Sequence, residues 1–380
     1  MVRHARASYE QRYPPTLEQG RLLRRLVQCR TSALGAHKTA CDRCGHEEIA
    51  YNSCRDRHCP KCQASSRARW LERQRRDLLP VPYFHLVFTL PPEVGRLAPF
   101  HRRAVYGMLF AAVARTLTTL ARDPKYLGAE LGWLAVLHTW GQRLQLHPHL
   151  HCLVPAGGLS PDGTHWIAAP HPRFLFPVRL LSRLFRKNFL ALLQRAWPRS
   201  GLDAATDGPP DDWALYRQKL LARDWVVYVQ PPWGGPDLVL KYLARYVHRV
   251  AIANERLVAL QGGKISFRWR DSAHGRRERT LQLETVEFVR RFLRHQLPRA
   301  FRHIRHYGFL ANRAGRARRE ALLRTIPAVP PPAEPAEPTP AAETAPRCPL
   351  CGTGRMLFVA LLVDPAAAGS PRPIRAPDSS

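Results

Sequence analysis

The chain has 380 residues, which suits one to three domains, and 45% of them are hydrophobic, enough for a sizeable core. No stretch approaches the roughly 18 uninterrupted apolar residues that a membrane-spanning helix needs. The opening segment, MVRHARASYEQRYPP, lacks the apolar core of a signal peptide. We therefore expect a soluble, cytoplasmic protein with no membrane partner.

Positive charge dominates the composition. Lysine and arginine outnumber aspartate and glutamate by 59 to 29, so the net charge is +30, and the calculated isoelectric point is about 10.9. Because a field this positive attracts polyanions, nucleic acid is the favoured partner. An anionic lipid surface and a merely solvated basic shell are the alternatives.

The predicted elements mix helices and strands along the chain. Residues 1–36 form a short helical lead, residues 37–62 hold five of the nine cysteines, and residues 63–79 form an arginine-rich helix that ends before Pro80. Further strands are predicted at 84–90, 133–140, 149–155, 224–230, 256–260, 264–270 and 279–283, and further helices at 97–122, 177–198 and 237–249. A basic helical region is expected from residue 284 to about 324.

Two CxxC pairs near the amino terminus have the spacing of a zinc site. Cys41 and Cys44 form the first pair, and Cys59 and Cys62 form the second after fourteen intervening residues. Each pair offers two thiolates from one tight turn, and Gly45 permits the first of these turns. We expect the four cysteines to bind one structural Zn²⁺ tetrahedrally. Nearby donors could replace one of these ligands or form a second site; they are Cys54, His58, His46 and His37.

A third CxxC pair, Cys348 and Cys351, follows a segment rich in proline, alanine and glutamate at residues 326–346. That segment has no periodicity, so we interpret it as a disordered linker. One pair does not complete a tetrahedral site, and partners would have to come from His303 and His306 or from another chain. We interpret the pair as a weak or vestigial knuckle.

His149-Leu150-His151 is a His-hydrophobe-His triplet in a predicted strand. Side chains two apart in a strand point to one face, so both imidazoles are able to bind one ion while Leu150 faces the core. Two unligated histidines on an exposed strand face are the alternative. A third ligand would leave room for a scissile phosphate; we assign Gln142 to it, with His138 as the other candidate.

Tyr242 and Tyr246 lie four residues apart in the helix predicted at 237–249, so they share one face. A phenol has a pKa of about 10, and a nearby metal ion or guanidinium makes its nucleophilic phenolate easier to reach. Ordinary amphipathic packing with the hydroxyls at the rim is the alternative. Positive charge along the same helix comes from Lys241, Arg245 and Arg249.

These segments together resemble the HUH-type transposases of the insertion-sequence-91-like group, and they occur in that family's order. CDRCGHEEIAYNSCRDRHCPKCQ is similar to the family's amino-terminal zinc-binding domain, and FHLVFTLP to its first core strand. LHTWGQRLQLHPHLHCLVPAGGLSPDG resembles its HUH segment, with His149 and His151 in the two histidine positions. GGPDLVLKYLARYVHRVAIAN resembles its two-tyrosine helix.

The resemblance implies an α+β fold. A zinc-ribbon-like module would precede a ferredoxin-like HUH endonuclease domain, which is an antiparallel sheet with flanking helices, the HUH strand at its centre and the tyrosine helix laid over it. The expected division is residues 1–80 for the helical lead and zinc module, 81–325 for the catalytic domain, 326–346 for the linker and 347–380 for the last knuckle and tail.

The resemblance also implies a mechanism. Tyr242 and Tyr246 would attack single-stranded DNA, giving a 5′-phosphotyrosine and a free 3′-hydroxyl, beside Mg²⁺ or Mn²⁺ bound to His149 and His151. The protein would be a metal-dependent single-strand endonuclease and strand transferase that moves its own element in rolling-circle fashion, at the nucleoid of a bacterial cell. Its partner would be the single-stranded ends of that element. The sequence indicates no oligomeric state.

Two other functions compete with this one. A plasmid replication initiator or conjugative relaxase shares the HUH chemistry. A non-enzymatic zinc-dependent nucleic-acid-binding protein would explain the charge and the cysteines, but not the histidine pair and the tyrosine helix in this order. We expect Arg67 and Arg69, beside the cysteines, to contact DNA phosphates; a solvated basic face is the alternative. Arginines and aromatic residues interleaved between residues 267 and 309 suit the binding of a single strand, although the aromatics are equally suited to a core.

Overall fold

The computed structural model describes residues 2–75, 78–197, 212–232, 238, 251–271, 275, 277–311, 322–326 and 345–363. The chain forms two compact units, of which the first combines residues 1–64 with residues 333–380 and the second spans residues 65–332. This division differs from the expected one, because residues 347–380 do not stand apart as a separate tail and the first boundary lies at residue 64 instead of residue 80. A strand after the last cysteines pairs with a strand before the first CxxC pair, and this pairing joins the two segments. The linker expected at 326–346 lies almost wholly outside the described residues.

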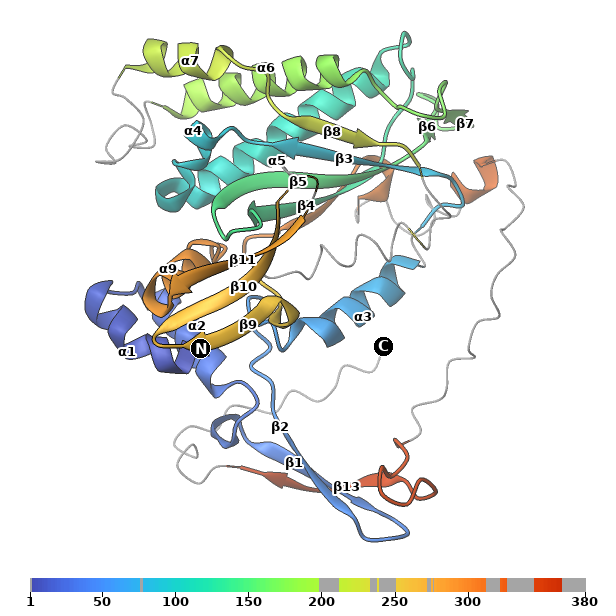
Figure 1. Ribbon diagram of the computed structural model, residues 1–380. Coiled ribbons are helices and arrows are strands. Elements are labelled where there is room, and N and C mark those ends of the chain that lie inside the picture. Colours follow the sequence, from blue (N-terminus) through green and yellow to red (C-terminus); the bar gives the residue numbers. More distant parts are fainter. Residues whose placement is uncertain are drawn as a thin grey trace. The chain divides into compact units, whose positions relative to one another are not determined.

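In its described residues, the first unit contains two helices, one 3₁₀ turn and a three-stranded antiparallel sheet in the order β13-β1-β2 (Figure 1). Its elements are α1 (Val2–Arg12), α2 (Leu17–Gln28), η1 (Ser32–Leu34), β1 (Ala36–Cys41), β2 (Glu47–Tyr51) and β13 (Met356–Leu362). Thr16 begins α2 with a capping box, in which its hydroxyl accepts from the Gln19 amide while the Gln19 side chain accepts from the Thr16 amide. Strands β1 and β2 flank the first CxxC turn, and β13 follows the last one.

The second unit is built around a five-stranded antiparallel sheet in the order β12-β4-β5-β3-β8. Its helices are α3 (Gln63–Arg75, at the unit boundary), α4 (Pro92–Gly95), α5 (Ala98–Arg122), α6 (Val178–Ala196), α7 (Trp213–Leu221) and α9 (Thr285–Arg294), with 3₁₀ turns η2 (Asn254–Arg256) and η4 (Gly308–Leu310). Its strands are β3 (Tyr83–Thr89), β4 (Trp133–Trp140), β5 (Leu146–Pro155), β6 (Gly157–Leu159), β7 (Trp166–Ala168), β8 (Val227–Gln230), β9 (Leu257–Gln261), β10 (Lys264–Asp271), β11 (Arg277–Glu284) and β12 (Ile304–Tyr307). The expected α+β class with an antiparallel sheet is confirmed, and the strand that carries His149 and His151 is its central one.

The two faces of the five-stranded sheet have different partners. Helices α5 and α6 cover one face (Figure 1), and every second residue of the three central strands packs there. The residues of β3, β4 and β5 in this main core are Phe84, Leu86, Phe88, Trp133, Ala135, Leu137, Leu150, Cys152 and Val154. The alternate positions therefore lie on the opposite face, where Leu134, Val136 and Leu153 belong to a second, smaller core.

Helix α5 is long and apolar enough, by length and composition alone, to cross a membrane. Most of its apolar window, 61%, is buried inside the protein, and its apolar side chains belong to the main core beneath the sheet. The hydropathy of α5 is thus accounted for by packing against the sheet and α6.

Sequence reasoning expected a basic helical region from residue 284 to about 324, and the structure corrects it for residues 295–311. Helix α9 ends at Arg294, and residues 304–307 form strand β12, which pairs with β4 at the edge of the sheet. Pro298 lies between the two elements, where a proline disfavours a continuous helix. Strands β9, β10 and β11, as predicted from residues 256–260, 264–270 and 279–283, form a second antiparallel sheet.

Candidate metal centres

Three histidines converge on the face of the sheet opposite α5 and α6. His149 and His151 share one face of β5 because they are two residues apart, and His138 of β4 lies directly opposite His149 in the register. One ring nitrogen from each histidine lies within 4.8 Å of the others. His138 and His151 are buried and His149 is half-buried. The strand pairing thus supplies a cluster of three nitrogen donors.

Gln142, the residue assigned to the third ligand position, lies in the loop that joins β4 to β5. It lines the cavity beside the histidines, and its main-chain carbonyl accepts a hydrogen bond from Arg256. The imidazole that the structure places with His149 and His151 is His138, the alternative that the sequence had left open.

A second layer of hydrogen bonds orients the histidine rings. His149 Nδ1 lies 2.6 Å from the carbonyl of His147; since a carbonyl only accepts, Nδ1 carries the proton and Nε2 keeps its lone pair. His151 Nδ1 lies 2.9 Å from Nε2 of His85 on β3, and the two rings are parallel within 1°. These contacts are of the kind that fix the tautomer of a metal-bound histidine.

His85 was missed by sequence reasoning, although a signal was present. It is a polar residue inside the apolar run FHLVFTL, and in the structure it is 2% exposed, on the same face as the three other histidines. Strand pairing, with His85 opposite Gln230 and Val87 opposite His151, brings it into the cluster. A histidine inside an apolar strand was therefore a signal of the site, but the spacing of residues in the sequence does not show which residues it contacts.

Burial favours the neutral form of His149 and of its neighbours His85 and His147. Burial lowers the pKa of His149 to about 4, with the nearby His147 lowering it further. Burial likewise lowers the pKa of His85 to about 4, and it lowers that of His147. At neutral pH His149 therefore offers a lone pair to a cation, because neutral imidazole is the form that binds metal.

A cavity of about 440 Å³ opens beside the histidines. Its lining residues, besides His138, His147, His149 and His151, are Trp140, Gly141, Gln142, Arg143, Gln145, Arg256, Trp269, Arg270 and Asp271. The Arg143 guanidinium lies over the Trp269 ring at 5.2 Å from its centroid, and the Trp140 ring stacks on His138 at 4.6 Å. The cavity thus combines cations and flat aromatic surfaces next to a cluster of nitrogen donors.

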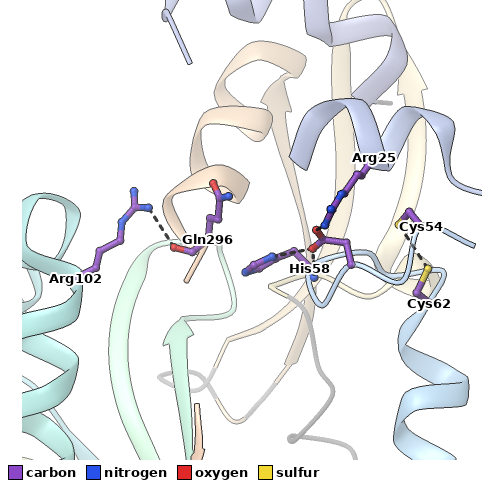
Figure 2. Close-up of polar contacts among 7 residues, drawn as sticks. Arg25, Cys54, His58, Cys62, Arg102 and Gln296 are labelled. Carbon is purple, nitrogen blue, oxygen red and sulfur yellow. Dashed lines mark hydrogen bonds and ion pairs between the residues drawn. The ribbon is translucent and has the colours of Figure 1, made fainter. Parts of the chain in front are cut away.

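The cysteines of the first unit form two groups of four. In one group the sulfur of Cys29 lies 3.5 Å from those of Cys59 and Cys62, and Cys54 lies 3.7 Å from Cys62 (Figure 2 shows Cys54 and Cys62). Burial and hydrogen bonds within the group shift the pKa values of its thiols in opposite directions. Burial raises the pKa of Cys59, whereas at Cys62 burial is outweighed by hydrogen bonds from the other sulfurs, which lower the pKa.

A salt-bridged loop supports this first group. The Asp56 carboxylate accepts from the His58 amide at 2.9 Å, lies 3.0 Å from His58 Nδ1, and receives the Arg25 guanidinium at 3.2 Å (Figure 2). These contacts lower the pKa of Asp56 to about 2, against the opposing effect of its burial. His58 therefore pairs with Asp56 and lies outside the group of four sulfurs.

The second group joins the first CxxC pair to the last. Cys41 lies 3.7 Å from Cys351, and Cys44 lies 3.6 Å from Cys348, sulfur to sulfur. The expected ligand set of Cys41, Cys44, Cys59 and Cys62 is corrected accordingly, because its two halves fall into different groups. The CxxC turns were correctly recognised as pairs, but sequence spacing does not show which pair lies beside which, and it gave no reason to include Cys29.

Two family models match the chain. Residues 1–90 match the family described as "Transposase zinc-binding domain", and residues 132–318 match the family described as "Putative transposase". A Sinorhizobium fredii protein named "Putative transposase y4qJ" is 52% identical over 299 residues, which are 78% of this chain and 75% of the relative. The transposase for insertion sequence element IS801 from Pseudomonas savastanoi pv. phaseolicola is 30% identical over 305 residues, 76% of this chain and 69% of the relative.

The chain belongs to the insertion-sequence-91-like transposase family. In this transposase the matched residues 132–318 contain His138, His149 and His151, and the matched residues 1–90 contain the first group of cysteines. Cys348 and Cys351 lie outside both matched ranges.

Solved structures of the conjugative relaxase TrwC also align with the transposase. Its metal-free complex with oriT DNA is 15% identical, with 43% of this chain and 70% of the relaxase covered and a TM-score of 0.24. Its metal-bound complex with oriT DNA gives 14% identity, the same coverage and the same TM-score.

Several predicted site residues of the transposase lie outside the described residues. They are Tyr242, Tyr246, Lys241, Arg245 and Arg249. Arg67 and Arg69, also predicted to contact DNA, are exposed on α3. Their positive charge therefore faces solvent, where a polyanion has access to it.

Proposed function

We propose that this transposase nicks and rejoins single-stranded DNA through a 5′-phosphotyrosine intermediate and so drives rolling-circle-type transposition of its own element. One observation carries the proposal: His138, His149 and His151 gather their ring nitrogens within 4.8 Å of one another, beside a cavity lined by arginine and tryptophan. Phosphodiester chemistry uses both a metal-binding cluster and positive charge beside it.

The donor set fits a catalytic cation. Three imidazoles from two neighbouring strands are held in place, with Nδ1 of His149 and of His151 engaged in hydrogen bonds behind the cluster. A divalent ion bound by three such ligands keeps positions for phosphate oxygens, which it would polarise and orient. Imidazole donors suit the first-row transition metals better than Mg²⁺, which prefers oxygen ligands. Of the two ions that the family uses, Mn²⁺ is therefore the better fit.

The cavity has the chemistry of a single-strand binding site. Flat rings of Trp140 and Trp269 offer surfaces on which unpaired bases stack, and Arg143, Arg256 and Arg270 offer charge to phosphates. Arg143 already lies over Trp269, so this ring is held in a defined orientation. Duplex DNA presents its bases already stacked, so a pocket that stacks bases favours a single strand.

The proposed nucleophiles are Tyr242 and Tyr246. In the proposed step the phenolate oxygen of one tyrosine forms a bond to the scissile phosphorus, and the bond from phosphorus to the 3′ oxygen breaks. The phenol proton ends on the departing 3′ oxygen through solvent, so no external energy source is consumed. The second tyrosine would allow the covalently held strand to be transferred to a new 3′-hydroxyl.

The zinc-binding domain completes the proposal. We assign a structural Zn²⁺ to Cys29, Cys54, Cys59 and Cys62, because four thiolates close the coordination shell. The sulfur separations of 3.5–3.7 Å match the edge of about 3.8 Å that a tetrahedron with zinc–sulfur bonds of about 2.3 Å has. The exposed Arg67 and Arg69 follow this site in the sequence and are assigned to DNA phosphates.

A covalent-adduct assay tests the function. Single-stranded oligonucleotides from the ends of the element are incubated with the protein and Mn²⁺, Mg²⁺ or no metal, and adducts are separated on denaturing gels. We expect a metal-dependent adduct that is absent from Tyr242→Phe/Tyr246→Phe and present in the control His165→Ala, which replaces an exposed histidine of the same unit. Cleavage by the double tyrosine variant would refute the assigned nucleophiles, and DNA binding without any adduct would support the non-enzymatic alternative.

The genetic setting separates the transposase from a replication initiator or relaxase of the same chemistry. We expect the gene to lie inside an element with subterminal hairpins and without target duplication. DNA binding should weaken steeply as salt increases, because phosphate contacts release counterions. A flat salt response would contradict the electrostatic part of the proposal.

A further inference from the structure

Cys41, Cys44, Cys348 and Cys351 come from segments that are 304 positions apart at their nearest, yet they share one end of the β1–β13 pair. The two turns have the same sequence form, a CxxC pair followed by glycine. They also share one backbone geometry. The Gly45 amide donates to the Cys41 carbonyl at 3.2 Å, and the Gly352 amide donates to the Cys348 carbonyl at 3.0 Å. Both glycines have a positive φ, 71° and 68°, which a residue with a side chain rarely adopts.

Backbone amides in both turns point at sulfur. The amides of Arg43 and Cys44 donate to Cys41 Sγ at 3.4 and 3.5 Å. In the other turn the Gly354 amide donates to Cys351 Sγ at 3.3 Å. Such donors stabilise a thiolate, the form of cysteine that binds a metal. Two matched turns of this kind are the two halves of a zinc site.

The four sulfurs have the dimensions of a tetrahedral zinc site. All lie within 4.8 Å of one another, and the separations across the two turns are 3.6 and 3.7 Å. Zinc–sulfur bonds of about 2.3 Å give a tetrahedral edge of about 3.8 Å. A disulfide would require a separation of about 2.05 Å, so the spacing is that of ligands and not of bonded sulfurs.

Contacts outside the sulfurs also join the two turns. The Asp42 amide donates to the Arg355 carbonyl at 3.1 Å, and the Arg355 amide donates to the Asp42 carboxylate at 2.8 Å. A Cβ added to Gly354 would lie 2.3 Å from Cys41 Sγ, so only glycine allows this approach. Met356 is buried against Cys41 and Cys348. The arrangement of the four sulfurs therefore depends on both the amino-terminal and the carboxy-terminal segment.

We propose that these four cysteines bind a second zinc ion, which fastens strand β13 to β1 and makes residues 345–363 a working part of the zinc-binding unit. Four thiolates leave no open position, so the ion is structural. Its removal releases β13 from β1, because the strand pair closes a chain loop of several hundred residues whose entropy opposes that closure. The site is separate from the first cysteine group and from the chemistry at the histidines.

Metal analysis of the full chain tests the proposal. All proteins carry His149→Ala/His151→Ala, so that the histidine centre contributes no metal, and zinc per chain is measured by mass spectrometry after gel filtration. We expect two zinc ions in this background, one after Cys348→Ser/Cys351→Ser is added, and one after Cys29→Ser/Cys54→Ser is added. The control Cys152→Ala, a buried cysteine of the second unit, should retain two.

A single zinc ion in the background protein that survives Cys348→Ser/Cys351→Ser would overturn the proposal, as would two disulfides in the freshly purified protein. Hydrogen exchange shows whether the variant is folded. Amides of β1 and β13 should lose protection in Cys348→Ser/Cys351→Ser, while those of α2 keep theirs. Cys351→His, which retains a metal donor, should restore the second zinc and the protection of β13. Failure of this variant to do so, with α2 intact, would also overturn the proposal.

Discussion

The histidine cluster and the cysteine groups gather metal donors in different ways. His138, His149 and His151 project from paired strands of one sheet, so strand register alone sets their separations. The cysteines project from turns and helix ends, and Cys29 follows the last turn of α2. Strand-borne donors keep their places without an ion, whereas turn-borne thiolates repel one another unless an ion binds them.

The two kinds of site also differ in how many positions they leave open. Three imidazoles beside a cavity of about 440 Å³ leave room for a ligand to approach the ion. Four thiolates surround an ion on every side. A rigid, incomplete donor set suits catalysis, and a complete set suits structure.

Removal of zinc should unfold the first unit and leave the second folded. Structural zinc sites of this type bind with about 10–16 kcal/mol at pH 7, more than the free energy of unfolding of a small domain. With a strong chelator, hydrogen exchange should show loss of protection in α2, β1 and β2, and unchanged protection in β3, β4 and β5. An equal loss of protection in both units would show that the five-stranded sheet also depends on the cysteine sites. That result would contradict the contrast between the two kinds of site.

His151→Ala should abolish nicking and leave DNA binding nearly intact. The substitution removes one nitrogen donor and the hydrogen bond to His85, while the arginines of the cavity remain. Adduct yield and the dissociation constant for a single-stranded oligonucleotide measure the two effects. His149→Ala should behave alike. A loss of DNA binding as large as the loss of nicking would show that the cluster is structural.

His85→Ala should lower activity by about 10–100-fold, the usual effect of losing a residue that orients a metal ligand. His85→Gln should recover most of it, because the glutamine oxygen is able to accept from His151 Nδ1 where Nε2 of His85 now lies. Manganese titration of nicking should show the loss as weaker metal affinity. If His85→Ala lowered thermal stability alone, with the metal dependence unchanged, the positioning role would be refuted.

The smallest effect concerns His295, a buried histidine behind Trp140. Burial lowers its pKa to about 4, with its hydrogen bond to the Leu144 carbonyl opposing the shift. The pKa of this histidine in the unfolded chain is about 6.5. Between this pH and about 4 the unfolded chain binds a proton that the folded protein does not bind. The free energy of unfolding therefore falls as the pH falls, by up to about 1.4 kcal/mol per pH unit. Denaturant titrations at pH 4.5–6.5 measure the free energy of unfolding, and His295→Gln should reduce its dependence on pH. An unchanged slope of this free energy against pH would contradict the assignment to His295.

The elements that the sequence predicted well are those with clear local periodicity. The predicted strands 84–90, 133–140 and 149–155 correspond to β3, β4 and β5, and the predicted helices 97–122 and 177–198 correspond to α5 and α6. Strand β12 was misassigned, since IRHY is a short polar segment with no pattern of its own and becomes a strand by pairing with β4. Strand β13 was not predicted for a similar reason, because its partner β1 lies more than 300 residues away.

By itself the sequence determined which residues share a face or a turn. Strand periodicity placed His149 and His151 together, and each CxxC spacing made one turn with two thiolates, because these relations depend only on local backbone geometry. Only the tertiary structure decided which faces and turns meet. It brought His138 and His85 to the histidine pair through strand pairing, and it placed Cys29 with Cys59 and Cys348 with Cys44. Contacts between distant segments depend on how whole sheets pack and close, and no local spacing encodes them.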